Sequence, residues 1–363
     1  MRIAYLGQMA EVATENGISK KIAMQLSAWA QAGPEVRYFA LTATGEVWPG
    51  LTTARTEVWA RGHPLLRAVR SRVLCTRIRQ WRPDVIYFRF AHHSPGLPRL
   101  FREIPTIAEI NSDDLAEYRN TLPVAKQLYH RITRPRVLAP VAGFVTVTRE
   151  LAARFAPFGR PVIAIGNSVA LTDFPPLPPP AADLRRLAFL GTAGAPWHGL
   201  ERLAEIAVLL PQWSIEVIGV TAETWRQLAP VLPPANVHLH GPLPRSAYEP
   251  LLAGATAAIG SLALFKNGME EACSIKVREY LALGLPVIGG YEDTDIPSGS
   301  DYFLRLPNNA ASLASWRERI ASFVEHWRTR RVPRSAIAHL DVSVKEPQRL
   351  AFMQKIVAAS RHA

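Results

Sequence analysis

The sequence predicts an α/β protein of two doubly wound domains, each a parallel sheet covered by helices. Three observations support this fold class. The chain has 363 residues, which exceeds one ordinary domain and suits two. Short apolar runs alternate with helical patterns along both halves, and a proline-rich stretch that favours an extended connector separates them. We therefore expect an N-terminal domain over residues 1–172, a linker over 173–183 and a C-terminal domain over 184–344.

The N-terminal half opens with a strand, a loop and a helix. Residues 3–6 alternate like a strand, the following loop reaches Gly17, and Ile22, Leu26 and Trp29 recur at helical spacing. The segments EVRYFAL, PDVIYFRF, IPTIAEI and GFVTVT read as further strands. Ligands gather at the carboxyl ends of strands in open α/β sheets, so the polar residues that follow these strands are candidate site residues.

Residues 65–82 predict a basic helix. At about 100° per residue, one side carries arginines and the opposite side carries an apolar cluster. The arginines are Arg67, Arg72, Arg79 and Arg82, and the apolar residues are Leu66, Val69, Val73 and Trp81. Two interpretations stay open, a solvated helix packed on a sheet and a helix that contacts an anionic surface.

The net charge is concentrated in the same half. Residues 1–170 contain 23 Lys and Arg against 12 Asp and Glu, a net charge of +11, whereas the remainder contains 19 against 18. This asymmetry favours an anionic partner, which could be a membrane surface, a lipid phosphate or nucleic acid. Nucleic acid ranks well below lipid, because no recognition helix or aromatic-rich strand pattern is evident.

The C-terminal half repeats the alternation and ends in an informative stretch, residues 269–290. RLAFLG, WSIEVIGV and NVHLHG read as strands, and GLERLAEIAVLLP as a helix. In the final stretch Ser274 is a good N-cap for a helix that Gly284 ends, and Leu285 to Ile288 reads as a buried strand. The start of such a helix presents amide groups and the positive end of its dipole, which suit phosphate.

Two carboxylates, Glu271 and Glu279, frame this helix start. Together with the apolar helix and GLPVI that follow, they resemble the donor-binding signature of the retaining glycosyltransferases of family four (glycosyltransferase group 1). A pair of Glu at this interval also occurs on solvated helix faces, but the flanking Gly-Leu-Pro and apolar strand favour the resemblance. It implies the GT-B fold, with two Rossmann-like domains facing across a cleft and a C-terminal helix, residues 345–363, that crosses back to the first domain.

The resemblance also implies roles for individual residues. Glu271 would lie by the transferred sugar as a catalytic residue, Glu279 would hold the ribose hydroxyls, and the helix start would bind the diphosphate. The donor-binding candidates are Gly17, Thr192, His198, Leu243, Ala272, Cys273, Ser274, Lys276 and Glu279. Thr192 and His198 depart from the family, which commonly has Arg and Lys there. Neutralising the diphosphate would then depend more on the helix start, on Lys276, and on His198 if it is protonated.

The acceptor side is expected at the ends of the N-terminal strands. Asn111 is a further catalytic candidate, and Glu109, Asp113 and His92 are candidate acceptor contacts. The alternative reading for Glu109, Asn111 and Asp113 is that they cap the helix that follows. The neighbouring His92 and His93 do not have metal-ligand spacing on a strand.

The expected function is retaining, metal-independent transfer of a sugar from a UDP- or GDP-sugar to a sugar or lipid-linked acceptor, without a cofactor. Asp293 and Asp295 match a cation-binding Asp-x-Asp spacing but follow the strand after the helix. Bacterial-type polysaccharide, glycolipid or glycoconjugate biosynthesis would be the setting. With two cysteines and a strand-like opening instead of a signal peptide, we expect a cytoplasmic protein, at most peripheral at the inner face of the membrane. The alternatives are a noncatalytic nucleotide-sugar-binding protein and a GT-B epimerase or hydrolase.

Overall fold

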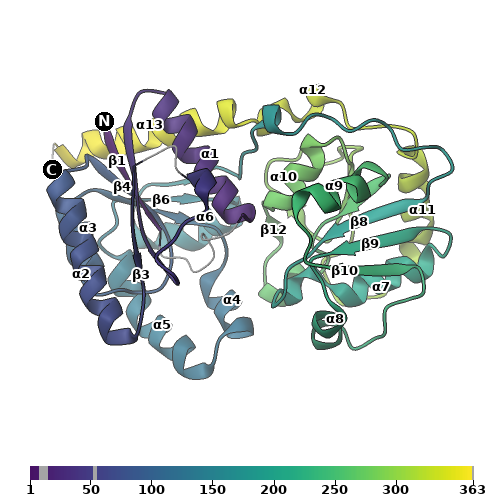
Figure 1. Ribbon diagram of the computed structural model, residues 1–363, viewed down its shortest axis with the longest axis horizontal. Coiled ribbons are helices and arrows are strands. Elements are labelled where there is room, and N and C mark those ends of the chain that lie inside the picture. The colour runs from purple at the N-terminus through teal and green to yellow at the C-terminus, as the bar shows by residue number, and fades with distance from the viewer. Residues whose placement is uncertain (8–14, 52–54, 362–363) are drawn as a thin grey trace. The chain divides into compact units, whose positions relative to one another are not determined.

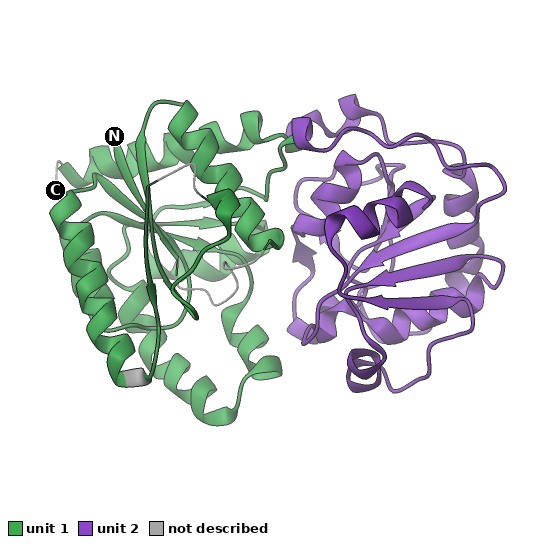
Figure 2. Cartoon of the chain, in the orientation of Figure 1, with its two compact units in different colours: residues 1–170, 340–363 green, residues 171–339 purple. Residues whose placement is uncertain are grey.

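A computed structural model describes residues 1–7, 15–51 and 55–361, so residues 8–14 of the expected loop before Gly17 lie outside the described part. The chain divides into two compact units, residues 1–170 with 340–363 (unit 1) and residues 171–339 (unit 2) (Figure 2). The segment expected to be a linker, 173–183, belongs to unit 2. The Leu177 amide donates to the Leu283 carbonyl, and Arg331 donates to the Pro178 carbonyl. Its prolines therefore run along unit 2.

Unit 1 is a parallel sheet of seven strands with helices between them. Its strands are β1 (Arg2–Gly7), β2 (Glu35–Thr42), β3 (Arg55–Ala60), β4 (Val85–Arg89), β5 (Thr106–Ile110), β6 (Gly143–Thr146) and β7 (Val162–Ala164). Its helices are α1 (Gly17–Gln31), α2 (Pro64–Trp81), α3 (Leu97–Glu103), α4 (Asp114–Thr121), α5 (Val124–Leu138), α6 (Arg149–Phe155) and α13 (Val342–Arg361). The strand order is β3-β2-β1-β4-β5-β6-β7. The order reverses between β1 and β4, which is where ligands bind in doubly wound sheets.

The C-terminal helix α13 belongs to the core of unit 1, beside α1 (Figure 1). Phe352, Met353 and Ile356 pack into the same cluster as the strand residues of the sheet. Gly143 in β6 allows this close approach, because a Cβ there would lie 3.0 Å from the Ile356 Cδ1 atom. The helix thus covers part of this face of the sheet together with α1.

The structure divides the apolar side expected for the basic helix α2. Leu66, Val69 and Val73 are exposed, whereas Trp81, expected on the same side, is buried. Of the four arginines expected to form one charged side, Arg67 donates to the Ser94 hydroxyl (3.3 Å) and Arg79 pairs with Glu103. The residues that α2 buries are Ser71, Leu74, Cys75, Ile78 and Trp81. The helix has two apolar rows, and periodicity cannot say which one meets the sheet.

Unit 2 repeats the design with a parallel sheet of six strands. Its strands are β8 (Arg186–Leu190), β9 (Ser214–Ile218), β10 (Val237–Gly241), β11 (Ala257–Ile259), β13 (Val287–Gly289) and β15 (Phe303–Arg305), with a separate parallel pair β12 (Glu271–Ala272) and β14 (Glu292–Asp293). Its helices are α7 (Leu200–Leu209), α8 (Ala222–Leu228), α9 (Arg245–Ala253), α10 (Ile275–Ala282), α11 (Arg317–His326) and α12 (Arg334–Ile337). The strand order is β10-β9-β8-β11-β13-β15, so its reversal lies between β8 and β11.

None of the described helices has a stretch with the length and hydrophobicity needed to traverse a bilayer.

Candidate functional site

Several donor candidates of unit 2, including Lys276 and His198, lie near the carboxyl end of β8 and the start of α10. Two side chains one turn apart on α10 hold the last residue of that strand. The Leu190 amide donates to the Tyr280 hydroxyl oxygen (2.6 Å), and the Lys276 ammonium donates to the Leu190 carbonyl (2.9 Å). The loop that follows is packed just as closely, because Gly219, at φ +83°, lies where a Cβ would be 2.1 Å from the Gly191 carbonyl oxygen. The strand end and the helix start therefore form one rigid assembly.

The start of α10 is a helix N-terminus whose N-cap side chain does not cap it. Ser274 occupies the N-cap, as predicted, but its hydroxyl makes no capping hydrogen bond. In contrast, Asn16, Asp113 and Thr148 cap their helices through their side chains. Helices α7 and α9 also lack a side-chain cap, so this feature alone does not mark a site. At α10 it leaves the amides of the first turn without a side-chain acceptor from Ser274, which is compatible with an anionic ligand.

A buried ion cluster fixes the loop that leads into this helix. The Arg278 guanidinium donates to both carboxylate oxygens of Asp293 (2.6 and 2.9 Å), to Asp295 (3.2 Å) and to the Cys273 sulfur (2.8 Å). Asp293 belongs to β14, which pairs with β12, the short strand that contains Glu271. Cys273, Asp293 and Asp295 are also spaced as metal ligands could be. Because a guanidinium already neutralises these carboxylates, the cluster functions as an anchor for the loop.

Lys276 lies in an environment that disfavours its charge. Its ammonium nitrogen is 4.2 Å from the centre of the Phe189 ring and has the Leu190 carbonyl as its acceptor. Burial lowers the pKa of Lys276 to about 7, because desolvation penalises the ammonium form. The side chain predicted to hold the diphosphate is thus close to half charged at neutral pH.

His198 cannot supply the second positive charge that the sequence left conditional. It is buried in the turn before α7, and its Nδ1 has no hydrogen-bond partner in the described structure. Burial, helped by the nearby Lys276 charge, holds the pKa of His198 well below its usual range. A neutral imidazole follows. Thr192 is exposed in the loop after β8, and Leu243 is partly buried after β10.

The two carboxylates of the signature have different surroundings. Glu271, on β12, accepts a hydrogen bond from the Thr294 hydroxyl (3.3 Å) and is partly exposed. Glu279 is partly buried on α10, one residue before Tyr280 and three after Lys276. On a helix the three-residue spacing places Glu279 about 60° around the axis from Lys276, while Tyr280 lies about 100° from Glu279. Their roles toward a ligand stay predictions.

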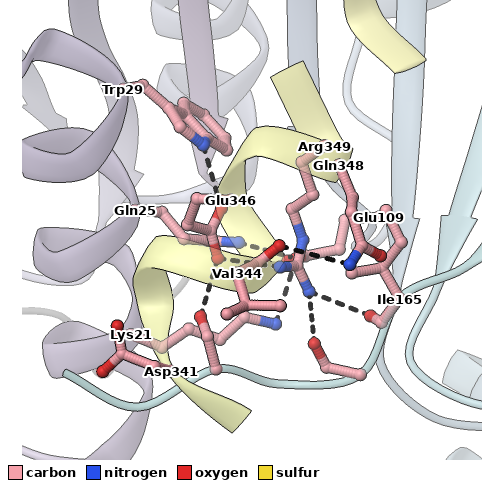
Figure 3. Close-up of polar contacts among 12 residues, drawn as sticks. Lys21, Gln25, Trp29, Glu109, Ile165, Asp341, Val344, Glu346, Gln348 and Arg349 are labelled. Atoms are coloured by element: carbon pink, nitrogen blue, oxygen red, sulfur yellow. Dashed lines mark hydrogen bonds and ion pairs between the residues drawn. The ribbon is translucent and has the colours of Figure 1, made fainter. Parts of the chain in front are cut away.

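In unit 1 the candidates lie at the carboxyl ends of β4 and β5, beside α1. Gly17 is the first residue of α1, where Asn16 and Ser19 form a capping box. At the end of β5, Glu109 is fully buried and meets Lys21 (3.0 Å), Arg89 (3.2 Å) and the Tyr87 hydroxyl (2.9 Å). Lys21, Glu109 and neighbouring residues are drawn in Figure 3.

This burial corrects the expectation for Glu109. Although desolvation opposes it, the adjacent Lys21 and Arg89 charges hold the pKa of Glu109 well below its usual range, so the side chain is a carboxylate enclosed by cations. It cannot meet an acceptor directly. It instead fixes its neighbour, since Asn111 donates to Glu109 (3.2 Å) and accepts from Lys21 (2.7 Å), which sets the direction of the amide.

The other acceptor candidates have structural partners. Asp113 caps α4 through the Leu115 and Ala116 amides, which is the alternative that the sequence left open, and it pairs with Arg154. His92 is partly buried and stacks on Tyr118 with ring centres 4.5 Å apart. Burial and the nearby His130 charge lower the pKa of His92 to about 4, so it is neutral at physiological pH.

Sequence reasoning missed Lys21 and Arg89. The sequence assigns Lys21 no role, and it places Arg89 only at the end of a strand. Their partner Glu109 lies 88 positions from Lys21 and 20 from Arg89, and only the pairing of β4 with β5 and the packing of α1 join them. The one signal in the sequence that could have pointed to these residues was the presence of polar side chains at the ends of the strands.

Comparison with known proteins gives a family match for the N-terminal region. Residues 16–167 match the family described as Glycosyl transferase 4-like domain. No curated protein sequence matches the chain.

Among solved structures, the chain is similar to sucrose-phosphate synthase from Thermosynechococcus elongatus, with a TM-score of 0.71, 16% identity and 99% of each chain covered. It is similar to HepE from Anabaena in complex with UDP and glucose, with a TM-score of 0.67 and 14% identity over 98% of this chain and 100% of that one. UDP-GlcNAc 2-epimerase from Neisseria meningitidis bound to UDP-GlcNAc gives 0.56 and 12% over 98% and 100%. The predicted GT-B fold is thus confirmed. The family match over residues 16–167 agrees with the resemblance to glycosyltransferases.

Proposed function

Since this chain carries a glycosyl transferase 4-like domain within a GT-B fold, we propose that it is a retaining glycosyltransferase. It would transfer a sugar from a UDP- or GDP-sugar to a sugar or lipid-linked acceptor held by unit 1. Two of the similar structures contain UDP with glucose and UDP-GlcNAc, which supports a nucleotide sugar as the donor. Synthesis of a polysaccharide, glycolipid or glycoconjugate at the cytoplasmic face of a membrane is the setting that the basic N-terminal half favours.

The observation that carries the proposal is the assembly at the start of α10. The helix start lacks a side-chain cap, Lys276 lies in its first turn, Glu271 precedes it and Glu279 follows within the helix, so one segment would offer contacts to diphosphate, sugar and ribose. The first turn and Lys276 would bind the diphosphate, Glu279 the ribose hydroxyls, and Glu271 the transferred sugar.

The chemistry we propose is substitution on one face of the sugar. The bond between the anomeric carbon and the diphosphate oxygen breaks, the acceptor hydroxyl oxygen bonds to the same face of that carbon, and the acceptor proton passes to the leaving phosphate oxygen. Negative charge develops on the diphosphate during this step, so the helix start and a protonated Lys276 stabilise the transition state. Asn111, oriented by Lys21 and Glu109, is our candidate for a contact to the acceptor or the sugar.

We propose that this transfer needs no metal ion. The Asp-x-Asp spacing of Asp293 and Asp295 would be the natural place for a cation, and both carboxylates are bound to Arg278. Turnover that persists with a strong chelator would agree with this proposal. Turnover abolished by the chelator and restored by magnesium would refute it.

Release of the nucleoside diphosphate from a panel of UDP- and GDP-sugars, with and without simple glycosides and lipid-linked sugars as acceptors, tests the function. A transferase releases the diphosphate only with an acceptor. Proton NMR should then show that the sugar in the product has the same anomeric configuration as in the donor. The similarity to UDP-GlcNAc 2-epimerase favours one competing function, for which the sugar would isomerise or hydrolyse without an acceptor. Binding without any turnover would indicate a noncatalytic nucleotide-sugar-binding protein. Either outcome overturns the proposal.

A further inference from the structure

Helix α2 of unit 1 presents an apolar row to solvent. The exposed fractions of its members lie between 42% and 76%, although the helix buries a second apolar row against unit 1. The exposed row consists of Leu65, Leu66, Val69 and Val73. Around it the surface is hollowed into a groove lined by Val69, Arg72, Val73, Thr76 and Arg77. The arginines form the rims of this groove and the valines lie between them.

Helix α5 repeats this arrangement. It buries His130, Thr133 and Val137, while apolar side chains with exposed fractions between 50% and 78% line the opposite side. These exposed residues are Val124, Leu128, Tyr129 and Ile132. Exposed Leu, Val and Ile are ordinary when they occur singly, but rows of them on two helices of the same unit mark an interaction surface.

Arginines flank each row in the same way. At about 100° per residue, Arg72 and Arg77 lie about 60° and 80° to either side of Val69, and Arg131 and Arg136 lie at the same angles from Leu128. All four arginines are exposed. An apolar stripe bordered by arginines is the pattern of a helix that lies in the interface of an anionic membrane, with its apolar side among the acyl chains and its cations at the headgroups.

The two helices are joined at one side of unit 1. Arg67 of α2 donates to the Ser94 hydroxyl, and the adjacent His93 Nδ1 lies 2.9 Å from the Tyr129 hydroxyl of α5. In Figure 1 the first turn of α2 and helix α5 lie at the lower edge of this unit. Residues 93 and 94 thus connect the start of α2 with Tyr129 of the α5 row.

We propose that the exposed rows of α2 and α5 form a monotopic docking face that inserts into the interface of an anionic lipid bilayer. Charge complementarity favours this occupant over a second copy of the chain, because pairing two such faces would bring their arginines together. The inference rests on the proposed function for its purpose, since a face of this kind would hold the enzyme where a lipid-borne acceptor is found. Lipid binding itself can be measured without sugar transfer.

Vesicle flotation tests the docking face. The probes are vesicles of phosphatidylcholine alone and of equal parts phosphatidylcholine and phosphatidylglycerol. The test variant Leu65→Gln/Val124→Gln removes one Leu and one Val, which are 76% and 78% exposed. The matched control Leu232→Gln/Val208→Gln removes the same pair of residue types from unit 2, where they are 82% and 67% exposed. Because all four side chains are exposed, neither variant disturbs a core.

We expect the wild type to float with the anionic vesicles and not with phosphatidylcholine alone. The test variant should bind the anionic vesicles at least about tenfold more weakly than the wild type, because two apolar side chains no longer enter the interface. The control should bind as the wild type does. Arg131→Gln/Arg136→Gln should weaken binding most at low salt. Equal binding of the test and control variants would overturn the inference, as would a wild type that ignores anionic vesicles.

Two further measurements keep the outcomes separate. If the wild type is a dimer in solution and the test variant a monomer, the rows are an interface between copies and the inference fails. Calorimetric binding of UDP and GDP to the same samples reports on the proposed function alone. Nucleotide binding without vesicle binding would overturn the docking face and leave the proposed function standing, and the reverse result would refute only the latter.

Discussion

Binding of a nucleoside diphosphate should draw a proton into the protein, and Lys276 should be its destination. Burial lowers the pKa of Lys276 to about 7, so at about pH 8 the neutral form outnumbers the ammonium form by about ten to one. A diphosphate beside the side chain favours the ammonium and raises that pKa. Binding at about pH 8 should therefore take up about nine tenths of a proton per site.

Calorimetry in buffers of different ionisation enthalpy measures this uptake, because the apparent binding enthalpy changes in proportion to the protons that the buffer supplies. The terminal phosphate titrates at about pH 6 and is therefore already ionised at about pH 8, so it contributes little to the proton uptake. The corresponding nucleoside lacks the phosphates and should bind without uptake. Lys276→Met should abolish the uptake and weaken the diphosphate much more than the nucleoside.

The sign of the pH dependence follows from the same shift. Above about pH 7 the free site must gain a proton to bind, so affinity for the diphosphate should fall by up to about tenfold per pH unit, while the nucleoside is unaffected. For folding the direction is opposite: the unfolded chain binds more protons at this lysine between about pH 7 and pH 10.5, so this group makes stability rise with pH there. Equal uptake by Lys276→Met and wild type, or no uptake by the wild type, would refute the assignment.

Three further predictions concern carboxylates. Glu279→Ala should weaken nucleotide binding by about 1.5 to 3 kcal/mol, because a ribose hydroxyl pair would lose its charged acceptor; unchanged affinity by calorimetry would contradict this role. Glu271→Ala should lower turnover more than nucleotide affinity if Glu271 contacts the transferred sugar, and equal losses would speak against it. Glu346→Ala should lower the free energy of unfolding by about 3 to 5 kcal/mol, since it leaves the buried Arg349 guanidinium without its carboxylate. Urea denaturation measures this against Glu223→Ala, an exposed control expected to change stability by less than about 0.5 kcal/mol.

The order of strands and helices could be predicted because it is encoded locally. Buried parallel strands are short apolar runs, the helices between them carry caps and helical spacing, and each such signal lies within about a dozen residues. The final helix α13 followed from its spacing and from the family resemblance, and its packing in unit 1 agrees with that expectation. The start and end of α10 were equally local, with Ser274 before it and Gly284, at φ +86°, after it.

What the sequence could not predict depends on contacts between distant residues. Glu109 reads as a polar residue at a strand end, and only the fold encloses it between Lys21 and Arg89. His198 reads as a possible cation, yet its burial keeps it neutral. In α2 both apolar rows have helical spacing, and which row is buried depends on the sheet that it covers.

The region of unit 2 that we expect to bind the donor has few fixed positive charges. Where the resembled family commonly has an arginine and a lysine after the first strand of the second domain, this chain has an exposed Thr192 and a neutral His198. The strand end is instead clamped by Tyr280 and Lys276, and Lys276 is largely neutral above about pH 7. An anionic ligand beside Lys276 would stabilise its ammonium form, so the positive charge at this site should be greatest when such a ligand is bound. If the proposed function holds, this site should favour a ligand whose phosphate lies close enough to the start of α10 to raise the pKa of Lys276.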